Sequence, residues 1–246
     1  MRNLIAGEAR KALTGRAWWY LPLAGAWLCL ITTFGYVSEG EKAIASGSTA
    51  LAVGQDVARA WMMMFLLSSV FGAVAVTRDY ASGTMIRSML LAGSRSRLFG
   101  AKLVVATAAG AVFGLFAVVL GTASVFLGPL PFGLEAAADG ETALILAGVF
   151  VCCLLAAPWG ALVGWIVRSQ TGAVATLLAL TLAVDPGLQR LVPDAAKFLL
   201  TIAMSSVYRD VKPDLLSLPW AYAVIAAWLA AAFLVGRRLV RTRDIV

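Results

Sequence analysis

The sequence predicts an all-α polytopic membrane protein: six transmembrane helices in a single domain over residues 1–246, with both termini in the cytoplasm. Three observations lead to this fold class. Hydrophobic residues make up 61% of the chain and charged residues only 13%, whereas a soluble domain averages about 25% charged residues. The apolar residues gather in several long runs, and the basic residues gather in alternate connections between those runs.

Each predicted span rests on the length of its apolar run, since a helix needs roughly 20 apolar residues to cross a bilayer. Four runs qualify readily and a fifth is near the lower limit: residues 17–37, 57–77, 103–127 and 143–167, and then 218–235. A further run, residues 171–184, is shorter. Its length alone leaves a tilted span, a re-entrant piece and a buried helix as alternatives.

The distribution of charge decides the number of spans. With six spans and cytoplasmic termini, 14 of the 20 Lys and Arg residues lie inside, with only 3 of the 13 acidic residues. With five spans, the basic cluster at residues 237–243 would lie outside, against the positive-inside rule. We therefore count residues 171–184 as a span. The net charge of +7 is then attributed to the membrane surface and not to nucleic acid.

Several kinds of chemistry have no support in the sequence. Histidine is absent, which removes the commonest general base and metal ligand. No phosphate-binding Walker loop, nucleophile elbow or catalytic triad is present. Cys29, Cys152 and Cys153 lie in apolar runs and form no metal-binding or disulfide pattern. We expect no catalytic, cofactor or metal site in this chain. No ionisable residue lies deep in a predicted span, which disfavours an ion-coupled transporter.

The polar, basic loop at residues 78–102 contains the clearest local pattern. Its apolar residues recur at helical spacing and share one face: Met85, Ile86, Met89 and Leu90. Arg87 and Ser88 fall on the other face, Ser82 or Thr84 is placed to cap the start, and Gly93-Ser94 ends the helix. The pattern predicts a short amphipathic helix along the membrane, with a plain interfacial loop as the alternative.

Small residues repeat every fourth position in the third and fourth spans. The third contains Ala106, Gly110 and Gly114, and the fourth contains Ala156, Gly160 and Gly164. Such stripes let helix backbones approach closely, either within the chain or at a subunit interface. Pro158 lies inside the fourth span and predicts a kink, because proline removes a backbone hydrogen bond.

Two further segments have weaker patterns. Residues 1–16 form a broad apolar helical face, interrupted by Glu8, that is suited to lying flat on the inner surface. Residues 185–217 begin with Asp185-Pro186-Gly187, which predicts a helix stop. They contain an apolar run at 198–204 that is too short to span, so it is either a re-entrant helix or a surface helix.

Taken in order, these motifs resemble ATP-binding-cassette (ABC) type-2 exporter permeases. The resemblance rests on Asp79-Tyr80-x-x-Gly83-Thr84, the Leu90-Leu91 pair, the Ser-Arg turn and the lysine that follows it. The start at residues 7–11 and the basic ending at residues 237–246 are also similar. The chain has Asp79 where the family more often has Glu, and Ser94 where it often has Pro.

The resemblance implies roles for these residues. Residues 79–91 would be the coupling helix that docks on a separate ATPase, with a basic end after it: Asp79, Tyr80, Gly83, Thr84, Met85, Ile86, Arg87, Met89, Leu90, Arg95, Arg97 and Lys102. Residues 1–16, with Glu8 and Lys11, would be the elbow helix. Residues 185–217 would be re-entrant helices whose apolar run closes the exit as an outer gate: Phe198, Leu199, Leu200 and Met204.

The implied function is that of a non-enzymatic permease subunit of an exporter in a bacterial plasma membrane, surrounded by membrane lipid. ATP and Mg²⁺ would be bound by two copies of a partner ATPase, and a second permease half, identical or related, would complete the pathway. The expected cargo is amphipathic or lipophilic, such as an antibiotic, an antimicrobial peptide or a lipid. The alternative is a membrane scaffold that recruits a cytoplasmic partner through the 78–102 loop.

Overall fold

The computed structural model describes residues 1–212 and 214–243, the side chain of Glu41 excepted, and all the regular elements in this part are helices. In chain order these are α1 (Arg2–Thr14), α2 (Ala17–Ala45), α3 (Ala50–Ala60), the 3-10 turn η1 (Trp61–Met63), α4 (Met64–Ala81), α5 (Met85–Ala92), α6 (Arg95–Leu127), the 3-10 turn η2 (Leu130–Phe132), α7 (Gly140–Val167), α8 (Gln170–Ala179), the π-helical turn η3 (Leu180–Val184), α9 (Asp185–Leu191), α10 (Pro193–Ala196), α11 (Leu200–Val207) and α12 (Leu218–Thr242).

Within the described residues, six helical segments are long and apolar enough to cross a membrane, which confirms the predicted number. Their bounds are Ala17–Ala45, Ala50–Ala81, Arg95–Phe132, Gly140–Val167, Gln170–Leu191 and Leu218–Thr242. Each is longer than its apolar run. The helices continue into polar sequence until a cap stops them, as at Ser94 and Asp139, whose side chains accept hydrogen bonds from the backbone amides of Arg97 and Thr142.

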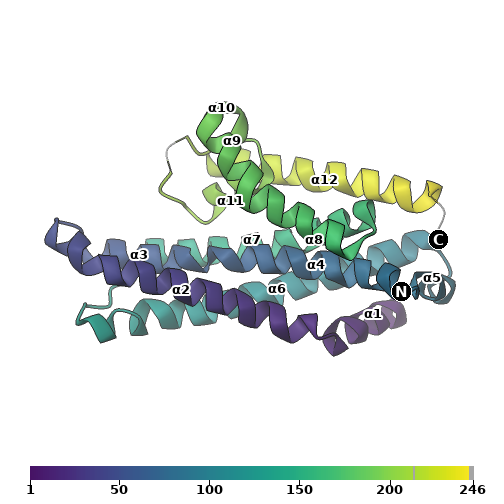
Figure 1. Cartoon of the computed structure of the whole chain (residues 1–246), viewed down its shortest axis with the longest axis horizontal. Helices are drawn as coiled ribbons and strands as arrows, with labels where there is room; N and C mark the ends of the chain where they lie inside the picture. Colours follow the sequence, from purple (N-terminus) through teal and green to yellow (C-terminus); the bar gives the residue numbers. More distant parts are fainter. Residues whose placement is uncertain (213, 244–246) are drawn as a thin grey trace.

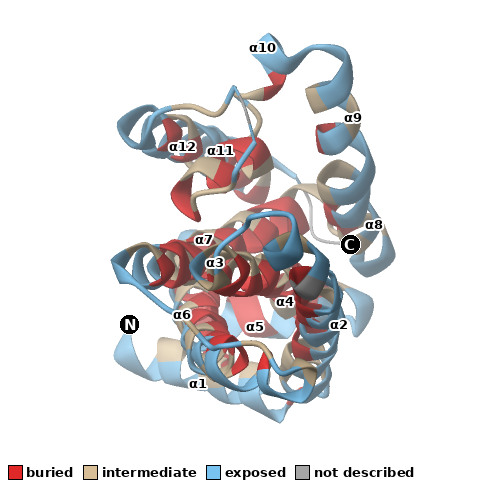
Figure 2. Cartoon of the chain, turned by 90° about the vertical axis from the view of Figure 1, so that its left-hand side faces the viewer, coloured by how far each residue is buried: buried red, intermediate tan, exposed pale blue. Residues whose placement is uncertain are grey.

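Successive segments run in opposite directions along one long axis (Figure 1). The start of α2, the short helix α5 and the end of α12 lie together at one end, with α1 beside them; we call this the basic end. The connection between α2 and α3 and the turn η2 lie at the opposite end, which we call the far end. The second segment is the most buried: 78% of its most apolar stretch lies inside the structure, compared with 17% for the fifth and sixth segments. Figure 2 shows the buried residues concentrated in α4, α6 and α7.

Both small-residue stripes are used for packing inside the chain. Gly110 and Gly114 of α6 face α7, where added methyl groups would lie 2.6 Å from the carbonyl oxygen of Cys153 and 2.8 Å from the Phe150 ring. Gly160 of α7 meets the Ser69 carbonyl oxygen of α4 with no room for a methyl group, and Gly164 lies against Ala73. Ala106 and Ala156 are also buried. Close backbone approach therefore joins α4, α6 and α7, and α7 runs through Pro158 as one helix.

The predicted helix stop at Asp185-Pro186-Gly187 is wrong. The fifth segment continues to Leu191, because the π-helical turn η3 comes directly before α9 and Pro186 lies in the first turn of α9. A proline is tolerated in a first turn, where its missing N–H is not needed. Asp185 thus becomes a buried carboxyl group within the segment, and it accepts a hydrogen bond from Thr201 of α11.

The segment after α9 is anchored to the rest of the chain. Leu200 and Met204 of α11 are buried in the cluster that α7 and α12 also line, whereas Phe198 is exposed and its carbonyl oxygen accepts a hydrogen bond of 2.9 Å from the Trp228 indole of α12. Leu199 precedes α11. Arg209 pairs with Glu141 of α7 at 2.6 Å.

Candidate functional site

The short helix α5 is held between two left-handed glycines at the basic end. Gly83 has φ +67° and Gly93 has φ +71°, a conformation that other residues adopt at a cost. Neither predicted cap is used. Thr84 precedes α5 but makes no capping hydrogen bond; its hydroxyl donates to Asp79 at 3.3 Å and lies 2.8 Å from the Ser82 hydroxyl. The Thr84 hydroxyl therefore interacts with Asp79 and Ser82 and not with the backbone of α5.

The buried face of α5 differs from the predicted one. Met85, Ser88, Met89 and Ala92 face the bundle, whereas Ile86, Leu90 and Leu91 are 52%, 78% and 77% exposed and Arg87 lies beside them. The prediction grouped Ile86 and Leu90 with the two methionines and placed Ser88 on the open side. It was wrong because the Ser88 hydroxyl is drawn into a polar cluster beneath the helix. We call Ile86, Leu90 and Leu91 the α5 outer face.

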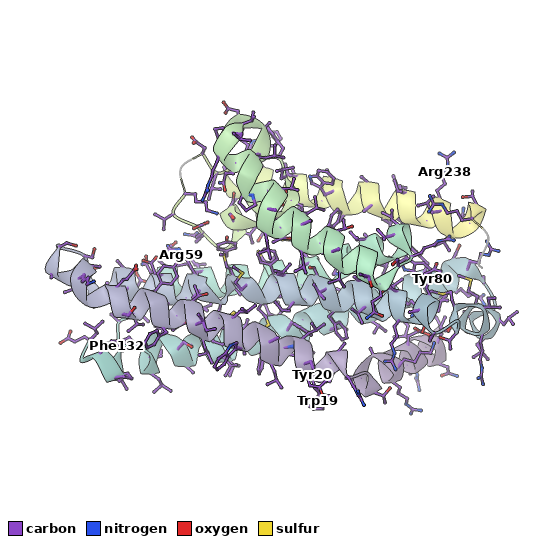
Figure 3. All side chains as sticks on the ribbon, in the orientation of Figure 1. Trp19, Tyr20, Arg59, Tyr80, Phe132 and Arg238 are labelled. Carbon is purple, nitrogen blue, oxygen red and sulfur yellow. The ribbon has the colours of Figure 1, made fainter. Side chains whose placement is uncertain are left out.

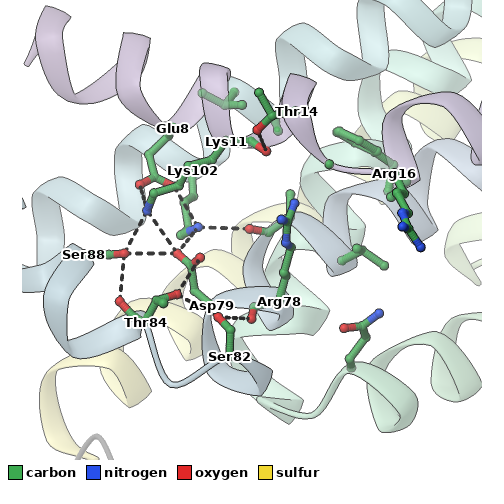
Figure 4. A pocket seen from close by; sticks show the side chains of 18 of the residues that line it. Glu8, Lys11, Thr14, Arg16, Arg78, Asp79, Ser82, Thr84, Ser88 and Lys102 are labelled. Atoms are coloured by element: carbon green, nitrogen blue, oxygen red, sulfur yellow. Dashed lines mark hydrogen bonds and ion pairs between the residues drawn. The ribbon is translucent and has the colours of Figure 1, made fainter.

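The polar cluster beneath α5 is centred on Lys102 of α6 (Figure 4). Its ammonium group lies 2.8 Å from Glu8 Oε2 and 2.8 Å from Asp79 Oδ2, and it donates to the Ala75 carbonyl oxygen at 3.0 Å. The residue is only 4% exposed. Lys11 lies at the rim, 2.8 Å from Glu8, 3.5 Å from Asp79 and 2.8 Å from the Ser88 hydroxyl.

This cluster joins four helices: α1 through Glu8 and Lys11, α4 through Asp79, α5 through Ser88 and α6 through Lys102. Two ammonium groups balance two carboxylates, as a buried ionic cluster requires, since an unpaired charge would be strongly destabilising. Asp79 and Lys102, which the resemblance assigned to the docking surface, are therefore turned inward. They fix α5 and α1 to the span ends and leave contact with any partner to the α5 outer face.

Two of the remaining predicted loop residues connect the end of α4 and the start of α6 to other helices. Tyr80 packs edge-on against Trp165, with 6.0 Å between the ring centroids. The Arg168 guanidinium carbon lies over the Tyr80 ring, 5.6 Å from its centroid. The Arg95 guanidinium donates to the carbonyl oxygens of Val240 and Arg243 at 3.3 and 3.1 Å, and so holds the end of α12. Arg97 is exposed. Sequence reasoning assigned no site role to Arg168, whose guanidinium also donates to the Leu239 carbonyl oxygen at 3.0 Å.

Outside the basic end, the described residues contain little that suggests chemistry. They include no group of three His, Cys, Asp or Glu side chains placed to hold a metal. The cysteines are free and buried. Tyr208 lies 3.0 Å from the Ser205 hydroxyl, and burial raises the pKa of its phenol, so it stays neutral. The basic end, with its exposed apolar helix, is therefore the candidate functional site.

Comparison with protein-family models finds no matching family, and comparison with curated proteins finds no matching relative.

Proposed function

We propose that this chain is the permease subunit of an ABC exporter, and that the α5 outer face docks on a separate ATPase subunit. The proposal rests on the resemblance of the loop motif and on one structural observation. Three large apolar side chains project outward from a short, well-anchored helix at the end of the bundle where the basic residues gather. A face of this kind, if cytoplasmic, needs a partner to cover it.

The placement of the basic residues supports a cytoplasmic position for this end. Helix α1, the start of α2, the α5 region at residues 78–102 and the end of α12 with Arg243 all lie there, and they contain 13 of the 20 lysines and arginines. Under the positive-inside rule such connections stay in the cytoplasm. That is the compartment in which an ATPase with bound ATP and Mg²⁺ would meet α5.

The buried ion cluster suggests how motion would pass from the ATPase to the spans. Glu8, Asp79 and Lys102 tie α5 to α1, α4 and α6, so a displacement of α5 is carried to the helix ends as a unit. A packed polar cluster of this kind is stiff, because breaking it exposes unpaired charge. Two such subunits, with two ATPases, would open a cavity outward for an amphipathic or lipophilic cargo.

The test is expression of this chain together with its neighbouring genes, followed by co-purification and identification of any bound protein with Walker nucleotide-binding motifs. The variant Leu90→Asp with Leu91→Asp removes two of the three apolar side chains of the α5 outer face. We expect it to lower the recovered ATPase by about tenfold or more, since each leucine contributes roughly 1.5–3 kcal/mol when buried. The matched control is Leu191→Asp with Val211→Asp, which changes two equally exposed apolar residues outside the basic end (79% and 72%).

The control should retain the ATPase and its vanadate-sensitive activity. Equal recovery with both variants would contradict the docking role of α5. Recovery of a partner without nucleotide-binding motifs, lost in the α5 variant alone, would favour the alternative of a scaffold that recruits a cytoplasmic protein.

A further inference from the structure

A cleft of about 930 Å³ opens at the basic end between α1, the start of α2 and the end of α4 (Figure 4). Five basic residues and two acidic residues line it: Lys11, Arg16, Arg78, Arg87 and Lys102, with Glu8 and Asp79. The cleft thus has a net positive lining.

The excess charge belongs to three arginines. Lys11 and Lys102 pair with the two carboxylates. Arg16, Arg78 and Arg87 form no ion pair with any residue in the described part of the chain. The Arg78 guanidinium lies against the turn between α1 and α2, where a methyl group on Gly15 would be only 2.5 Å from its Nη1. A planar guanidinium matches the geometry of a phosphate group, which it binds with two parallel hydrogen bonds.

The inner wall of the same cleft is apolar. Phe71, Val74 and Ala75 of α4 and Val105 of α6 line it, and Phe71 and Val105 are buried. Two aromatic residues mark the membrane level beside it: Trp19 and Tyr20, at the start of α2, are 66% and 65% exposed (Figure 3). Exposed Trp and Tyr gather at the headgroup level of a bilayer. A ligand with an anionic head and an apolar tail fits both walls.

We infer that this cleft binds the phosphate of an anionic phospholipid headgroup from the leaflet at the basic end. The three arginines that line the cleft attract the phosphate, and the acyl chains follow the wall formed by Phe71, Val74 and Val105. The inference does not depend on the proposed exporter function. A soluble phosphate compound shares the headgroup chemistry, but it has no acyl chain to contact the apolar wall.

The experiment uses the full chain, purified and delipidated in neutral detergent, with phosphatidylglycerol titrated and bound lipid counted by native mass spectrometry. The variant Arg16→Gln with Arg78→Gln and Arg87→Gln should lower the phosphatidylglycerol affinity by about 100-fold, since each basic residue near an anionic headgroup contributes roughly fivefold. The control, Arg237→Gln with Arg238→Gln and Arg241→Gln, makes the same charge change on exposed residues of α12. It should stay within about twofold of the wild type.

Inorganic phosphate and phosphatidylcholine provide the other arms, and both should bind far more weakly than phosphatidylglycerol. Tight, arginine-dependent binding of inorganic phosphate would replace the lipid by a soluble ligand and overturn the inference. Equal losses of phosphatidylglycerol affinity in the two triple variants would also overturn it. The arginines of the cleft would then act only through the total charge of the chain and not through a specific site. If the triple variant fails to fold, Arg78→Gln alone should lower the affinity by about fivefold, and an unchanged affinity would contradict the site.

Discussion

Replacing Lys102 with methionine should destabilise the fold by about 3 kcal/mol. The substitution keeps most of the side-chain volume but removes the charge between Glu8 and Asp79, both 2.8 Å from the ammonium group. Removing one partner from a buried ion pair costs about 3–5 kcal/mol, because the other charge is left uncompensated. We take the lower end, since Lys11 remains 2.8 Å from Glu8 and 3.5 Å from Asp79.

The assay is reversible unfolding of the purified chain by titration with a denaturing detergent, followed by tryptophan fluorescence. The matched control is Lys197→Met, which breaks the ion pair with the largely exposed Asp194 at 3.0 Å. An exposed pair contributes at most about 1 kcal/mol. The triple variant with Glu8→Gln and Asp79→Asn, besides Lys102→Met, should recover much of the loss because no buried charge remains unpaired.

Equal, small losses for Lys102→Met and Lys197→Met would contradict a buried ionic cluster at Lys102. They would mean that water reaches the cluster and screens it, so that the cluster does not fix α1 and α5 to the span ends. A triple variant no more stable than Lys102→Met alone would show that the loss comes from packing and not from unpaired charge.

Two further predictions concern α7. Gly160→Ala should push α4 and α7 apart and cost about 1–3 kcal/mol, as overpacking does. Gly35→Ala, whose added methyl group would meet nothing within 4 Å, should not destabilise the fold; similar losses in the detergent titration would contradict the close approach. Asp139→Ala should weaken the start of α7. Hydrogen bonds from the backbone amide and hydroxyl of Thr142 hold the pKa of Asp139 below its ordinary 3.8, so its contribution is present above pH 3.8 and is lost as the pH falls through the lowered pKa. The difference between wild type and variant should therefore shrink in acid, and a constant difference would exclude the carboxylate cap.

The number of membrane-length helices could be predicted from the sequence because apolar length and charge asymmetry act over whole segments. Their ends could not, because polar residues extend a helix as readily as apolar ones do. Residues 103–127 were predicted as a span, and the helix begins a further two turns earlier, at Arg95. The fifth segment continued past Pro186 because a π-helical turn precedes it, and sequence spacing gives no sign of such a turn.

The ion cluster was missed for a different reason. Glu8, Asp79 and Lys102 are far apart in the sequence, and each was assigned to a surface or to the docking loop. One signal was present: Glu8 interrupts the apolar face of residues 1–16, which a purely interfacial helix has no reason to allow. The same cluster explains the error on α5, because Ser88 is buried to reach Lys11 and Asp79.

Site-specific photo-crosslinking would show directly which protein contacts the α5 outer face. A photoreactive amino acid in place of Leu91 on the α5 outer face is compared, in cells, with one in place of Leu115 on the exposed face of α6. The proposed function predicts that position 91 crosslinks to a protein with Walker nucleotide-binding motifs and that position 115 does not. Crosslinks from position 91 to lipid alone, or to a protein without those motifs, would contradict it.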